Sequence, residues 1–163
     1  MARATTRAMS SERDVAGVPL PPPLIYVAGL AAGGVAEIVR STNGPPWPIS
    51  VAAALVGAVA FMALAGGAVG RFRRAGTTEN PFKPSTALVF DGPYRLTRNP
   101  MYLGMAAVYV GLALVLGLMW AFAFLPLVLL AVDRLVIARE ERYLERKFGR
   151  EYVEYKQRVR RWI

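Results

Sequence analysis

Three windows of this 163-residue chain are long, apolar and almost free of charge. Residues 24–39 contain a single charged side chain, Glu37, and residues 47–70 and 101–132 contain none. A helix rises about 1.5 Å per residue, so about 20 residues cross a hydrocarbon core of about 30 Å. The helices of a soluble bundle each need a polar face, which the window 47–70 does not offer. The windows therefore predict an integral membrane protein.

The window 101–132 is too long for one crossing and has Gly117 at its middle, so we predict a helical hairpin there. The predicted fold is all-α, with about four transmembrane helices. The expected spans cover residues 24–40, 49–70, 101–116 and 118–138. Together with the loop 71–99 and the region after the last span they form a single membrane domain, residues 24–163. We expect residues 1–23 to be a disordered cytoplasmic tail.

Positive charge is concentrated on one side of this topology. Of 20 Lys and Arg residues, three precede the first span, six lie between residues 71 and 98, ten follow Val132, and only Arg40 lies on the other side. The positive-inside rule then places both termini and the loop 71–99 in the cytoplasm, with the protein in the cell membrane. The net charge of +9 is explained by topology and by attraction to anionic lipid headgroups, and not by a nucleic-acid partner.

The chain has no cysteine and no histidine. This excludes the usual zinc sites, thiol nucleophiles, disulfides and imidazole bases, and we expect no metal site. Any chemistry must use carboxylates, tyrosines, arginines, backbone groups or a bound cofactor.

Polar and aromatic residues gather in the segment 91–104, DGPYRLTRNPMYLG, where an apolar helix begins. Pro100 suits the first turn of that helix, because its missing N–H would have no partner there. The preceding loop, residues 71–99, is unusually long, and its prolines and apolar side chains predict a folded functional loop against the helix ends.

The region 140–162 is strongly amphipathic. Six apolar or aromatic residues recur at steps of four or three and share one helical face. We predict one amphipathic helix, bent at Gly149, which lies either on anionic lipid or as a lid against the cytoplasmic loop. The stripe consists of Leu144, Phe148, Tyr152, Tyr155, Val159 and Trp162.

The segment GPYRLTRNPMYLG, followed after the hairpin by REERYLERKFGREYVEYKQRVRRWI, resembles the isoprenylcysteine carboxyl methyltransferase family and its phospholipid methyltransferase relatives. The resemblance covers residues 76–163, and the first two helices match only in being hydrophobic. It implies an integral membrane enzyme that uses S-adenosylmethionine, held between the cytoplasmic ends of the last helices and the loop before them.

The resemblance also implies individual site residues. Glu141 matches the cofactor-side glutamate of the family's Glu-Glu pair, and Tyr94 matches the tyrosine after its cofactor loop. Arg98 is placed to meet the carboxylate of the cofactor. The remaining matches are Thr86, Ala87, Leu88 and Val89 in the cofactor-contacting loop, and Asn99, Pro100, Met101 and Tyr102 in the His-Pro-x-Tyr segment.

Two positions depart from the family. Asn99 replaces the histidine, which keeps a donor and an acceptor but no titratable group. Val136 stands where the eukaryotic enzymes carry an arginine implicated in substrate binding, and Arg139 is the nearest substitute. We therefore expect Arg139 and Glu141 to be the catalytic residues.

The predicted function is methyl transfer from S-adenosylmethionine to a lipophilic acceptor that enters laterally between helices. The acceptor group is a carboxylate, a thiol or a lipid amine, and the sequence does not choose among them. The alternative is a non-catalytic scaffold that uses its basic amphipathic tail to bind anionic lipid or a partner. The oligomeric state stays open.

Overall fold

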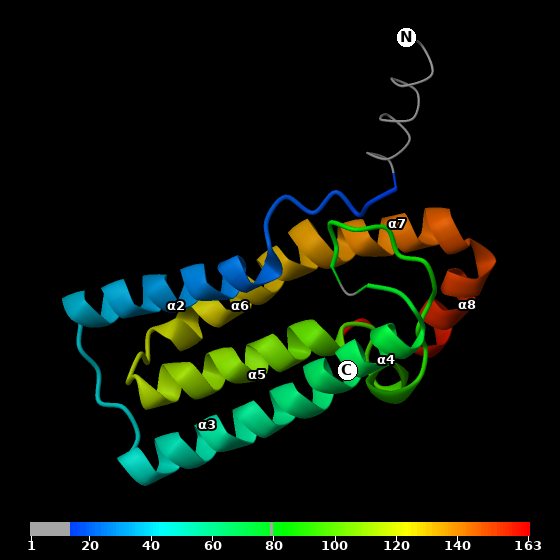
Figure 1. Cartoon of the computed structure of the whole chain (residues 1–163). Coiled ribbons are helices and arrows are strands. Elements are labelled where there is room, and N and C mark those ends of the chain that lie inside the picture. The colour runs from blue at the N-terminus through cyan, green and yellow to red at the C-terminus, as the bar shows by residue number, and fades with distance from the viewer. Residues whose placement is uncertain (1–13, 79) are drawn as a thin grey trace.

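The computed structural model describes residues 14–78 and 80–163, and these residues form helices and connecting loops without strands (Figure 1). The first helix is α2, Pro22–Val39. The second is continuous over Trp47–Arg74 and consists of α3 (Trp47–Phe61), a π-helical turn η1 (Met62–Gly66) and α4 (Gly67–Arg74). After the long loop and a short 3-10 turn, η2 (Gly92–Arg95), follow α5 (Pro100–Val115), α6 (Ala121–Ala131), the π-helical η3 (Val132–Ile137), α7 (Ala138–Phe148) and α8 (Arg150–Arg158).

Within the described residues, three helices are long and apolar enough to cross a membrane: Pro22–Val39, Trp47–Arg74 and Ala121–Phe148. The remaining predicted span, residues 101–116, corresponds to α5, which is apolar but shorter, at 16 residues. This confirms the all-α membrane class. The last crossing helix continues past the predicted span 118–138 as α7, so one rigid element joins the membrane region to the segment outside it (Figure 1).

The apolar helices pack in two pairs, α2 with α6 and α3 with α5 (Figure 1). Glycine allows the close approach in each pair. A Cβ on Gly33 of α2 would lie 2.6 Å from the Cα of Ala121, and one on Gly57 of α3 would lie 2.6 Å from the carbonyl oxygen of Ala107. Small residues at such crossings let helix backbones gain van der Waals contact in lipid, where no hydrophobic force drives association.

Two buried tyrosines join the pairs through hydrogen bonds to the backbone. The hydroxyl of Tyr26 on α2 donates to the carbonyl of Tyr102 on α5 at 2.8 Å, and that of Tyr109 donates to the carbonyl of Ala121 at 2.7 Å. Each phenol thus satisfies its polar atom within the protein, as an apolar environment requires.

Residues 14–21, which were predicted to belong to a disordered tail, lie against the protein. Val18 is buried in the main apolar core, and Asp14 forms an ion pair with Lys147 of α7 at 2.7 Å. Of the rest of the predicted tail, residues 22–23 begin α2, and residues 1–13 lie outside the described residues. Burial of the apolar Val18 side chain stabilises the contact between this segment and the protein. The polar and proline-rich composition of the segment did not indicate that contact.

The predicted amphipathic helix 140–162 is divided into two. Gly149 has φ of +56°, a conformation that favours glycine, and α8 turns back from α7 there. Tyr152 and Tyr155 are buried against the cytoplasmic loop, with Leu144, Phe148 and Val159 packed beside them, while Trp162 packs against the main core. The structure thus favours the lid alternative over a helix lying on lipid.

Candidate active site

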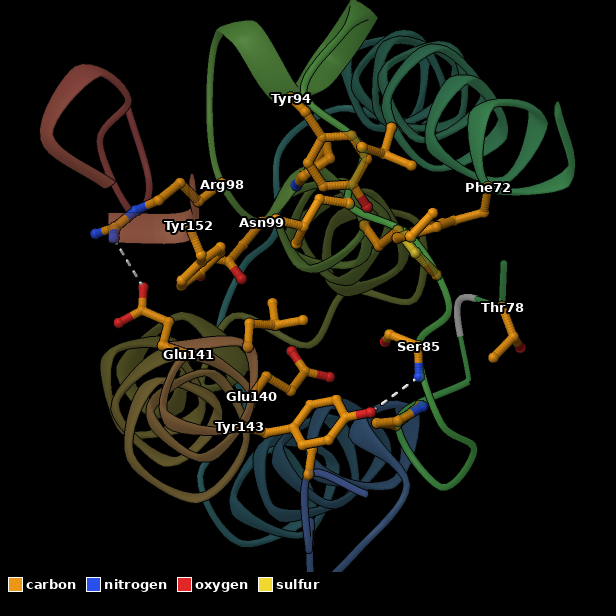
Figure 2. Close-up of a pocket in the computed structure, with 18 of the residues that line it drawn as sticks. Phe72, Thr78, Ser85, Tyr94, Arg98, Asn99, Glu140, Glu141, Tyr143 and Tyr152 are labelled. Atoms are coloured by element: carbon orange, nitrogen blue, oxygen red, sulfur yellow. Dashed lines mark hydrogen bonds and ion pairs between the residues drawn. The ribbon is translucent and has the colours of Figure 1, made fainter. Parts of the chain in front are cut away.

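A pocket opens where the long loop, the start of α5, α7 and α8 meet (Figure 2). Its volume is about 110 Å³, several times the roughly 10–15 Å³ that one water needs by the same measure. Its wall is mixed, with apolar and aromatic side chains from the loop and acidic and aromatic side chains from α7 and α8. The main polar and aromatic members are Asn80, Lys83, Phe90, Tyr94, Arg98, Asn99, Tyr102, Glu140, Glu141, Tyr143, Tyr152 and Tyr155.

Most residues that the resemblance pointed to line this pocket. Thr86 and Arg139 do not. The Thr86 hydroxyl donates to the carbonyl of Gly76 at 3.0 Å and so closes a loop turn. The Arg139 guanidinium donates to the carbonyl of Gly17 at 3.0 Å, on the N-terminal segment. The predicted residues in the wall are Ala87, Leu88, Val89, Tyr94, Arg98, Asn99, Pro100, Met101, Tyr102 and Glu141.

Glu140 places its carboxylate toward the centre of the pocket (Figure 2). The Tyr102 hydroxyl donates to Glu140 Oε1 at 2.7 Å, so α5 and α7 meet directly at this pair. No Lys or Arg in the described part of the chain forms an ion pair with Glu140. Sequence comparison with the family directed attention to Glu141, and Glu140 was recognisable only as its neighbour in the acidic pair.

Glu141 turns sideways toward Arg98 instead (Figure 2) and is only 5% exposed. Arg161, near the C-terminus, donates to both carboxylate oxygens, from Nη2 at 2.5 Å and from Nε at 3.1 Å. Arg98 Nη1 lies 3.3 Å from Oε1, and Lys156 Nζ lies 3.9 Å from Oε2. Three cations therefore share this buried carboxylate.

The same C-terminal segment is fixed to the start of α5 through the backbone. The carbonyl of Arg161 accepts from Thr97 Oγ1 at 3.0 Å and from Asn99 Nδ2 at 2.9 Å, and the Arg98 N–H donates to the carbonyl of Arg160 at 3.0 Å. Asn99 stands where the family has histidine, and its side-chain amide thus binds the C-terminal segment. No sequence pattern indicated this clamp.

Aromatic side chains close the pocket on the side of α8. The Tyr155 hydroxyl donates to the carbonyl of Tyr94 at 2.7 Å, and the ring centroids of Phe90 and Tyr155 lie 4.7 Å apart. Burial raises the pKa of Tyr152 and of Tyr155 above the ordinary value, so both phenols stay protonated near neutral pH. The stripe of the amphipathic region contained both tyrosines, although their place in a pocket wall needed the fold.

The opposite rim is held by Tyr143 of α7. Its hydroxyl oxygen accepts from the Ser85 N–H at 3.0 Å (Figure 2) and from Lys147 Nζ at 3.1 Å. Ala16 of the N-terminal segment also lines the pocket. Loop, helix and N-terminal segment are thus joined around one opening.

Comparison with known proteins places this arrangement in a family. A family model described as phospholipid methyltransferase matches residues 49–151, well over half of the chain. The chain belongs to the phospholipid methyltransferase family. It is therefore a membrane methyltransferase, and methyltransferases of this family generally use S-adenosylmethionine.

A relative of this phospholipid methyltransferase family member has no described function. An uncharacterized protein of Haemophilus influenzae is 44% identical over 63 residues, which make up 39% of this chain and the whole of that protein. No solved structure gives a significant match.

Proposed function

We propose that the pocket binds S-adenosylmethionine and that the protein transfers its methyl group to a lipophilic acceptor at the cytoplasmic boundary of the membrane. The observation that carries the proposal is convergence: Tyr94, Tyr102 and the acidic pair Glu140 and Glu141 come from separate segments and line one pocket. That pocket lies where apolar helices end, so a cofactor from water and an acceptor from lipid can both reach it.

The residues present fit the cofactor. Leu88, Val89 and Phe90 offer an apolar wall for the adenine, and the Glu140 carboxylate can accept from its hydroxyl or ammonium groups. Arg98 has a buried Nε–H with no hydrogen-bond acceptor among the described residues, which is the kind of donor that the cofactor's carboxylate would satisfy.

S-adenosylmethionine supplies a methyl group that its sulfonium already activates, so the chain needs mainly to bind, orient and exclude water. Glu140, held by the Tyr102 hydroxyl, presents carboxyl oxygens to the ligand as hydrogen-bond acceptors. Glu141 acts as a positioning residue, because its carboxylate holds Arg98 and the C-terminal Arg161 in place. The α8 tyrosines and the N-terminal segment shield the pocket from water.

Among the three acceptor classes we favour the lipid amine. A lipid amine can donate a hydrogen bond to the Glu140 carboxylate, whereas a carboxylate or thiolate acceptor has no hydrogen to donate to it. Incubation of the protein with methyl-labelled cofactor and each acceptor class, followed by mass spectrometry, tests this choice. Label in a thiol or a carboxylate, with none in phosphatidylethanolamine, would contradict it.

Cofactor binding is tested by calorimetry on the full chain in detergent, with S-adenosylmethionine and its demethylated product. Glu140→Gln should weaken binding about tenfold, because a charge-assisted hydrogen bond becomes a neutral one. Glu154→Gln is the matched control, since the only ion pair of Glu154 within the described residues is with the exposed Arg150 on α8. Absence of binding by the native chain well above micromolar concentration would reject the proposal, and equal affinity of Glu140→Gln would remove Glu140 from the site.

The alternative of a non-catalytic scaffold depended on an exposed apolar stripe in the amphipathic region 140–162. Tyr152 and Tyr155, at the centre of the apolar stripe, are 4% and 5% exposed. The stripe is therefore used inside the protein and is not available to a partner or to lipid.

A further inference from the structure

A second depression lies beside the pocket, and the segment 88–90 lines both. This groove is more open than the pocket and runs between the end of α4 and the turn η2. Its charged lining consists of Arg71, Arg74, Asp91 and Arg95. The methyl-transfer proposal uses none of these four charged residues.

The charges in the groove do not cancel. Arg71 Nε binds Asp91 Oδ2 at 3.0 Å, and Arg71 Nη1 donates to the carbonyl of Gly67 at 3.3 Å, so this pair is fixed and neutral. Arg74 and Arg95 are both exposed, and their guanidinium groups form no ion pair or hydrogen bond with residues 14–78 or 80–163. Two cations are left facing one open groove.

The place of the groove at the end of an apolar helix indicates its depth in a membrane. Arg71 and Arg74 lie in the last turn of the helix Trp47–Arg74, directly after the uncharged window 47–70. An arginine at that position reaches the headgroup layer, where the phosphates of the lipid lie. The planar guanidinium binds phosphate oxygens through two parallel hydrogen bonds, which makes arginine well suited to this anion.

We propose that this groove is a binding site for the phosphate of an anionic phospholipid in the cytoplasmic leaflet, held by Arg74 and Arg95. The site lies beside the cofactor pocket, shares the segment 88–90 with it and does not depend on the proposed methyl transfer. A soluble phosphate ester presents the same chemistry, but the position of the groove at the end of an apolar helix favours the lipid.

The experiment measures binding of phosphatidylglycerol to the purified full chain in neutral detergent, by native mass spectrometry. The double variant Arg74→Gln/Arg95→Gln should bind about tenfold more weakly or worse, because each arginine near a headgroup adds to the attraction. The matched control is Arg142→Gln/Arg146→Gln on α7, where both side chains are exposed, lie outside the groove and form no ion pair within the described residues. It should bind like the native chain.

Five further results decide the proposal. An equal loss in the α7 control would overturn it, because net charge alone would then explain binding. Equal binding of zwitterionic phosphatidylcholine would overturn the anionic specificity, and displacement of the lipid by an equal concentration of glycerol 3-phosphate would make the ligand a soluble ester. Arg74→Lys/Arg95→Lys should show intermediate affinity, and native affinity would overturn the role of the paired hydrogen bonds from each guanidinium. Cofactor affinity of the Gln variant should stay within twofold of native, which separates this test from that of the pocket.

Discussion

Two adjacent carboxylates in this protein have opposite surroundings. Successive residues of a helix point about 100° apart, so Glu140 and Glu141 cannot face the same partners. Glu140 faces the pocket and, among the described residues, its carboxylate is bound only by the Tyr102 hydroxyl, whereas Glu141 is surrounded by arginines. We therefore assign ligand contact to the first and internal positioning to the second.

Glu141→Gln should lower the free energy of unfolding by about 2 kcal/mol, because it leaves Arg98 and Arg161 without their shared carboxylate. The figure is below the roughly 3–5 kcal/mol of a fully buried pair, since Arg161 keeps one third of its side chain exposed. Thermal or urea unfolding in detergent measures the change. Glu154→Gln serves as the control and should stay within about 0.5 kcal/mol of native. An unchanged midpoint for Glu141→Gln would contradict the positioning role.

At the scale of helices, packing depends on glycines that face a neighbour. Gly33 and Gly34 are adjacent on α2, yet only Gly33 faces α6 closely. A Cβ on Gly33 would meet backbone atoms of Ala121 at 2.6–2.7 Å, whereas one on Gly34 would meet only side-chain carbons of Leu118 at 3.9–4.0 Å. The pair therefore offers a direct comparison of two identical substitutions.

Gly33→Ala should destabilise the protein by about 1–3 kcal/mol, because the backbones of α2 and α6 must separate to admit the methyl group. Gly34→Ala should be neutral or slightly stabilising, since alanine is the better helix former. Unfolding midpoints of the two variants in the same detergent check this. Equal midpoints would show that the two helices adjust to each other without cost.

The π-helical turn η3 has a further consequence at this scale. Its i→i+5 bonding takes up one extra residue, which rotates every later side chain relative to a regular helix. The direction of Glu140 and Glu141 is set just after this turn. Helical periodicity counted from the membrane span therefore does not predict which glutamate faces the pocket.

For the whole molecule, the charge distribution predicts a topology that labelling can test. The chain has no cysteine, so a single introduced thiol is the only reactive one. Asn43→Cys, in the loop between α2 and α3, should react with a membrane-impermeant maleimide in intact cells. Gln157→Cys, on the exposed face of α8, should react only after the membrane is opened. The unmodified chain is the control, and the reverse pattern would place the pocket outside the cell.

The amino-acid sequence determined the all-α membrane fold class and indicated most of the residues that line the pocket. Apolar windows such as 47–70 are local and uncharged, and each must cross a membrane or be buried. The resemblance between residues 92–104 and a known family likewise pointed to the helix start that forms the pocket wall, where Tyr94 and Tyr102 lie.

Tertiary structure decided what those residues face. The burial of Val18, the fold-back of α8 at Gly149 and the hold of Arg161 on Glu141 join segments far apart in the chain. The energy of such contacts depends on distances and directions that no local pattern contains. Hydrophobicity alone thus placed the helices in the membrane, whereas packing between distant segments selected Glu140 as the carboxylate that faces the pocket.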